Sequence, residues 1–203
     1  MPTITVKNNS SHSQTFLVHG FQGGNNPGTI TVKGNGGTGD VKSPDHKQVS
    51  GAIIATHGGK EGEQAEVTFN GYPEGKNQYY DISYIVGGGG NLTIEQKGAP
   101  NTRKGDATFM QDCNAAWQKL SADKKKALQR FVHLDAKGKV SRIDAPKNDK
   151  GLEDWVRTFA HGVYVGVGAW KDEKGNEEDN KQSSATPGGN KDLLVVFTDN
   201  NDN

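Results

Sequence analysis

The chain is poor in cysteine and in hydrophobic residues. Cys113 is the only cysteine among 203 residues, so no disulfide can form within the chain. Secreted domains with a small core usually rely on disulfides, and only 31% of these residues are hydrophobic. The missing disulfides therefore favour a cytoplasmic protein, and the 28 glycines predict many strands joined by polar loops.

The chain also lacks long apolar runs and a net charge. No apolar run is long enough to span a bilayer, and the first residues show no basic region followed by an apolar stretch, so no transmembrane segment and no signal peptide are predicted. The 24 basic and 24 acidic side chains cancel, which leaves no overall field to attract nucleic acid. We expect no nucleic-acid partner, and the sequence says nothing of the oligomeric state.

Alternating apolar and polar residues predict a β-rich chain. The predicted strands cover residues 3–7, 14–19, 29–33, 51–56, 64–70, 78–86, 91–96, 163–170 and 192–198. The last of these is apolar enough to lie in the centre of a sheet. Residues 34–48 are predicted to form a long polar loop.

The pattern changes to helical spacing between about residues 106 and 162. Helices are predicted over 107–120, over 122–132 with Ser121 as N-cap, and over 151–160. Strands thus precede and follow a helical stretch. The order predicts a mainly β fold, an antiparallel β-sandwich in a single domain of residues 1–203, with residues 106–162 inserted as helices.

Two strand segments carry a family resemblance. Residues 65–69 read AEVTF and residues 80–87 read YDISYIVG, and together they resemble two consecutive strands of the thaumatin-like family. The first strand and the final strand also resemble that family's opening and closing strands. The resemblance implies a thaumatin-like sandwich and favours a secreted protein with a defence or antifungal role. The specific motif covers about a sixth of the chain.

The resemblance places two acids in the family's acidic cleft. Glu66 and Asp81 match two of its carboxylates, while Val86 stands where the family has another Asp. The family's arginine has no counterpart, since no Arg precedes Arg103, and its disulfides are absent. These departures favour a lectin-like protein that recognises a carbohydrate, such as a cell-wall polysaccharide, or a cell surface, over an enzyme.

Glu66 and Asp81 can also be read from their positions alone. On neighbouring strands they could share one face, where two acids bind sugar hydroxyls or hydrolyse a glycosidic bond. The same alternation also fits ordinary solvent-facing positions. One alternative function is therefore a β-glucan hydrolase that uses both acids. Another is a membrane-active toxin or a protein-interaction module that acts through the helical insertion.

Tyrosines cluster near these acids. Tyr72, Tyr80 and Tyr84, with Tyr79 between them, are candidate ligand contacts, because aromatic side chains recur in recognition surfaces. Packing in the core or in a turn is the alternative explanation for all of them.

No cofactor is predicted, and one segment resembles a metal loop. Residues 135–144 resemble a shortened EF-hand loop, which makes Asp135 and Asp144 candidate metal ligands. Lys137 and Lys139 stand where that loop needs acids, and no glutamate ends it. The expectation is that no metal binds here.

Overall fold

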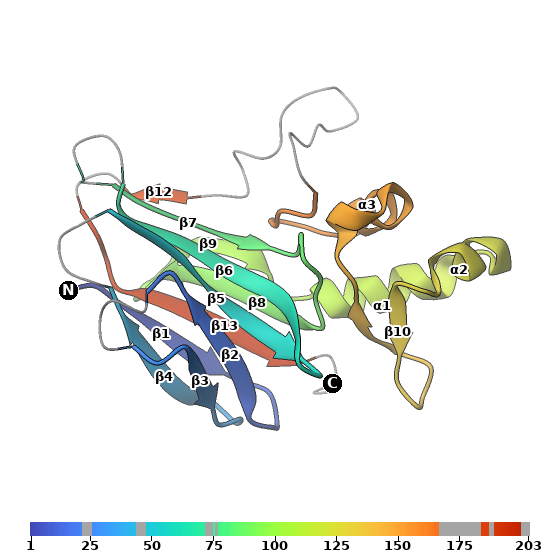
Figure 1. Ribbon diagram of the computed structural model, residues 1–203, viewed down its shortest axis with the longest axis horizontal. Helices are drawn as coiled ribbons and strands as arrows, with labels where there is room; N and C mark the ends of the chain where they lie inside the picture. Colours follow the sequence, from blue (N-terminus) through green and yellow to red (C-terminus); the bar gives the residue numbers. More distant parts are fainter. Residues whose placement is uncertain are drawn as a thin grey trace.

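Two β-sheets pack as a sandwich, and the helices lie beyond one end of it (Figure 1). This arrangement is that of a computed structural model, which describes residues 1–21, 26–43, 48–71, 75, 77–166, 184–186 and 189–199. The mainly β sandwich predicted from the sequence is therefore confirmed. Within these residues, no helix combines the length and apolar character that a membrane crossing requires.

The first sheet has five strands, and its centre is formed by the end of the chain. Its order is β4 (Gly37–Lys42), β1 (Thr3–Asn8), β13 (Leu193–Asp199), β8 (Gly90–Gln96) and β9 (Ala99–Asp106). The C-terminal strand β13 lies between β1 and β8, as its apolar sequence predicted. It runs parallel to β1, whereas the other pairs of named strands are antiparallel.

The second sheet has six strands and carries the motif that resembles thaumatin-like proteins. Its order is β12 (Ser184–Thr186), β7 (Asn77–Ser83), β6 (Lys60–Gly71), β5 (Val49–His57), β2 (Gln14–His19) and β3 (Thr29–Val32). Strands β6 and β7 are direct antiparallel neighbours. The two segments of the motif therefore lie side by side.

The facing sides of the two sheets form the core. Phe16 of the second sheet meets Phe197 of the first edge to face, with 5.6 Å between ring centroids, and both are buried. Ile4, Val6, Ile53 and similar side chains fill the space around them. Each such side chain contributes about 1.5–3 kcal/mol to stability on full burial.

The stretch between β9 and β12 forms the helical part. It contains α1 (Phe109–Lys119), α2 (Ala122–Leu128), the hairpin β10 (Val132–Leu134) and β11 (Val140–Ile143), the 3₁₀ turn η2 (Pro146–Asn148) and α3 (Lys150–Arg157). Phe109 at the start of α1 stacks on Tyr84 after β7, with ring centroids 3.7 Å apart. This stack joins the helices to the sandwich core.

Several predicted elements differ from the structure, three of them most clearly. Strand β4 falls inside the predicted polar loop, because β4 is an edge strand that buries little more than Val41. Helix α2 ends at Leu128, and residues up to 132 no longer belong to it. Of the predicted strand 163–170, the described part contributes a single bridge from Tyr164 to Ser83, and residues 167–170 lie outside the described residues.

Candidate functional site

A polar row crosses the outer face of the second sheet. His19, Ala52, Glu66 and Asp81 are successive register partners on β2, β5, β6 and β7. Successive residues of a strand point to opposite faces of the sheet. The residues next to these four are buried and point into the core, so the four themselves point outward. The structure thus brings Glu66 and Asp81 together on one face.

A groove of about 480 Å³ lies over this row. Ser50, Thr68 and Tyr79 form the next row across the sheet, and all three line the groove. The hydroxyl oxygens of Ser50 and Thr68 are 2.7 Å apart and share a hydrogen bond. Gln64 adds an amide, so the groove floor offers carboxyl, hydroxyl and amide groups.

The surroundings of Asp81 favour its protonated form. Burial, the charge of Glu66 and a hydrogen bond with the Glu66 side chain raise the pKa of Asp81 to about 8. Asp81 Oδ1 is buried and has no donor among the described residues, so a fully ionised pair would leave it without a hydrogen bond. A proton held by Asp81 at neutral pH removes the repulsion between the two carboxyl groups.

The predicted tyrosines divide between core and groove. Tyr80 and Tyr84 are fully buried, so their assignment as ligand contacts is corrected. Their hydroxyls donate to the backbone carbonyls of Thr102 and Gly90. Tyr72 lies outside the described residues. Tyr79 is 36% exposed and lines the groove, and strict alternation with Asp81 is the signal that distinguishes it from Tyr80.

A second pair of titratable residues was not predicted. His57 Nε2 lies 3.0 Å from each carboxylate oxygen of Glu63, and Glu63 is fully buried. The backbone N–H of Gly89 donates to the same carboxylate at 2.9 Å. Burial lowers the pKa of His57, but the charge and hydrogen bond of Glu63 outweigh it, and the pKa is raised. His57 and Gly89 likewise outweigh the burial of Glu63 and lower its pKa.

The metal candidates are occupied by protein donors. Asp135 Oδ1 accepts the backbone N–H groups of Lys137 and Lys139 at 2.8 and 2.9 Å and so fixes the β10–β11 turn. Asp144 Oδ1 lies 2.6 Å from Arg142 and 3.0 Å from His133. In the described ranges, no group of three or more His, Cys, Asp or Glu side chains is placed to hold a metal ion.

Comparisons with known proteins give little further information. No protein-family model matches the chain, and no curated protein matches it. One similar solved structure is a laminaripentaose-producing beta-1,3-glucanase in complex with laminaritetraose. The overlap covers 71% of this chain and 52% of that one, at 10% identity and a TM-score of 0.43. The chain thus spans about half the length of that glucanase, and an overlap this low carries no argument about function.

Proposed function

We propose that the groove on the six-stranded sheet recognises a carbohydrate, with Glu66 and Asp81 as its central ligands. The observation that supports this is the pair of neighbouring carboxyl groups in the floor of a groove that also presents three hydroxyl groups and the Gln64 amide. Sugar hydroxyls both donate and accept hydrogen bonds, and a singly protonated carboxyl pair does the same. Tyr79 supplies an aromatic side chain at the edge of the pair.

We also propose that the chain is related to the thaumatin-like family. The β6–β7 pairing puts the acids of the two matched segments opposite each other, which supports the resemblance of these two strands to the family's acidic cleft. It is therefore proposed that the chain is a distant, disulfide-free member of that family with a lectin-like role. The proposed partner is a cell-wall polysaccharide or another glycan.

Binding is favoured over hydrolysis by the closeness of the two acids. Glycosidases hold their two carboxyl groups about 5 Å or more apart, so that both can flank the scissile bond. Glu66 and Asp81 are instead cross-strand neighbours on one sheet face, with Cβ atoms about 4.5–5.5 Å apart, so they lie side by side and do not face each other across the groove. A β-glucan hydrolase that uses this pair would first have to separate it.

A glycan array tests the proposal. Wild type is compared with Asp81→Ala, which removes the carboxyl group, and with Glu66→Gln, which removes the charge with little change in shape. Glu61→Gln is the matched control, because Glu61 is an exposed acid on the same strand outside the groove. We expect both groove variants to lose the wild-type signals and the control to keep them. If both groove variants kept the wild-type array signals, the assigned site would be wrong. If the wild-type protein released reducing sugar from β-glucans, its function would be hydrolysis and not binding alone.

A further inference from the structure

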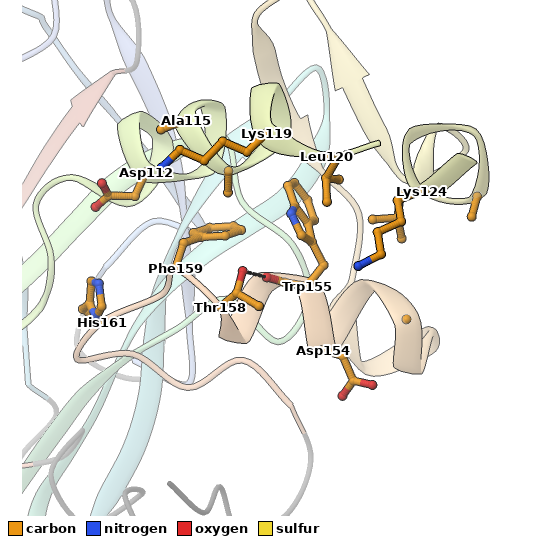
Figure 2. Close-up of a pocket in the computed structure, with 14 residues that line it drawn as sticks. Asp112, Ala115, Lys119, Leu120, Lys124, Asp154, Trp155, Thr158, Phe159 and His161 are labelled. Atoms are coloured by element: carbon orange, nitrogen blue, oxygen red, sulfur yellow. Dashed lines mark hydrogen bonds between the residues drawn. The ribbon is translucent and has the colours of Figure 1, made fainter. Parts of the chain in front are cut away.

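The sheet groove and a larger groove between the helices differ in charge. The helical groove runs between α1, α2 and α3, has a volume of about 730 Å³, and is lined by two aspartates and two lysines. Figure 2 shows the Lys119 ammonium group beside Asp112, so opposite charges meet there. The sheet groove is lined by Glu66 and Asp81 and, among the described residues, by no lysine or arginine. An excess of acid therefore distinguishes the sheet groove.

The two acids of the sheet groove have no cationic partner. Glu66 and Asp81 are register partners, and neither forms an ion pair with any residue that the structure describes. Side chains at such positions have Cβ atoms about 4.5–5.5 Å apart, so one cation can contact both carboxyl groups. Burial and then the charge of Glu66 raise the pKa of Asp81 to about 8, so the pair resists a second negative charge. A positive charge on a ligand would offset this repulsion.

The rest of the lining suits a sugar that carries the cation. Ser50 and Thr68 present hydroxyl groups in the row next to the pair. Tyr79 precedes Asp81 by two residues on β7 and is 36% exposed in the groove. An aromatic ring packs against the apolar face of a sugar and also attracts a cation over its own face. Charge, hydroxyl groups and ring thus lie within one groove.

An ammonium group fits the pair better than a metal ion does. Calcium takes six to eight oxygen ligands, and in the described ranges no group of three or more His, Cys, Asp or Glu side chains is placed to hold a metal. An ammonium group has three N–H donors, which the oxygens of the two carboxyl groups and a neighbouring hydroxyl group can accept. The groove volume of about 480 Å³ also exceeds the needs of an ion and lies in the range of small-molecule sites.

We infer that the sheet groove prefers a glycan that carries free primary amines, such as a polymer of glucosamine. This inference rests on the proposed carbohydrate-binding function and names the class of glycan. The ammonium group contacts Glu66 and Asp81, and the sugar ring lies against Tyr79. The remaining sugar hydroxyl groups form hydrogen bonds with Ser50 and Thr68.

Calorimetry with three β-1,4-linked tetrasaccharides tests the inference on the full chain. Their units are glucosamine, N-acetylglucosamine and glucose, so they differ in carrying an ammonium, a neutral amide or a hydroxyl group at C2. At about pH 6 the free amine is protonated. We expect the glucosamine tetramer to bind at least about ten-fold more tightly than the other two, and to bind more weakly as salt is added.

Variants locate the preference. In Glu66→Gln the affinity for the glucosamine tetramer should fall to that for the neutral tetramers, while Glu61→Gln, outside the groove, should keep the wild-type preference. A preference that survives in Glu66→Gln would overturn the inference. Saturable binding of calcium chloride alone, lost in Glu66→Gln, would also overturn it, because the pair would then be a metal site.

The outcomes separate this inference from the carbohydrate proposal. Equal affinity for the three tetramers, or tighter binding of a neutral one, would overturn the amine preference and leave carbohydrate binding in place. Failure of the glucosamine tetramer to bind, with other glycans bound on the array, has the same meaning. If neither the tetramers nor any glycan on the array bound, both would be wrong.

Discussion

Glu66 and Asp81 are register partners on neighbouring antiparallel strands, and burial together with the charge of Glu66 raises the pKa of Asp81. Cross-strand residues with like charges destabilise a sheet when both are ionised. A raised pKa of Asp81 relieves that repulsion, because one carboxyl group keeps its proton. The pair therefore presents both a donor and acceptors to the groove near neutral pH.

The first prediction concerns stability against pH. Because the pKa of Asp81 rises from 3.8 to about 8 on folding, the folded chain holds a proton that the unfolded chain has released. This contribution is fully present below pH 3.8 and is lost as pH rises to about 8. It falls by about 1.4 kcal/mol for each pH unit in that window. Asp81→Asn cannot ionise and should be more stable than wild type above that window.

Urea denaturation at about pH 5 and about pH 9 measures the difference. The difference between Asp81→Asn and wild type should increase in favour of the variant as pH rises. Glu61→Gln serves as the control and should follow wild type at both pH values. A constant difference between Asp81→Asn and wild type would show that Asp81 ionises normally in the folded chain.

The second prediction concerns His57 and Glu63. His57→Gln leaves the fully buried Glu63 carboxylate without its cation, so the free energy of unfolding should fall by about 3–5 kcal/mol. His133→Gln is the control, because His133 pairs with Asp144 at an exposed position, and it should cost about 1 kcal/mol or less. Chemical denaturation of both variants checks this, and equal losses would contradict the buried ion pair.

The same pair sets a pH window of its own. Glu63 has a lowered pKa, so its contribution is present above 4.5 and is lost as pH falls through the folded value. His57 has a raised pKa, so its contribution is present below 6.5 and is lost as pH rises through the folded value. The stability that His57→Gln removes should therefore be largest between these two values.

The third prediction concerns the junction between sandwich and helices. Gly105 on β9 has φ +100°, and its N–H donates to the carbonyl of Gly162 at 3.1 Å. A Cβ there would collide with the backbone carbonyl of Leu92. Gly105→Ala should destabilise the fold by more than about 2 kcal/mol.

Gly98→Ala is the matched control. Gly98 also has a left-handed φ of +85°, but no atom lies within 4 Å of the position its Cβ would take. The free energy of unfolding of Gly98→Ala should therefore fall by only about 1 kcal/mol, the cost of placing alanine at a positive φ. Thermal denaturation of both variants separates strain from collision, and equal losses would show that the junction is loosely packed.

The sequence predicted the central strands better than the edges. Alternating apolar residues identify β1, β2 and β6, because one face of each strand is buried against the other sheet. Edge strands β4 and β9 bury fewer side chains and take their register from a neighbour, so their polar sequences resemble loops. These segments form strands because they pair with a neighbouring strand in the folded chain, which their own sequences do not indicate.

The candidate site could be predicted only in part. Alternation on adjacent antiparallel strands was enough to expect Glu66 and Asp81 on one face. Glu63 could not be found in this way, because the register shifts between Ile54 and Thr56, and Glu63 then follows Gly62 into the interior. The groove itself also depends on β2 and β5, which meet β6 only after folding.

The most direct test of the carbohydrate proposal is one dissociation constant. The strongest glycan on the array is titrated calorimetrically into wild type, Glu66→Gln and Glu61→Gln. We expect Glu66→Gln to bind at least about ten-fold more weakly than wild type, because it loses a charge-assisted hydrogen bond to the glycan. Glu61→Gln should keep the wild-type affinity. Equal affinity of all three proteins would contradict it.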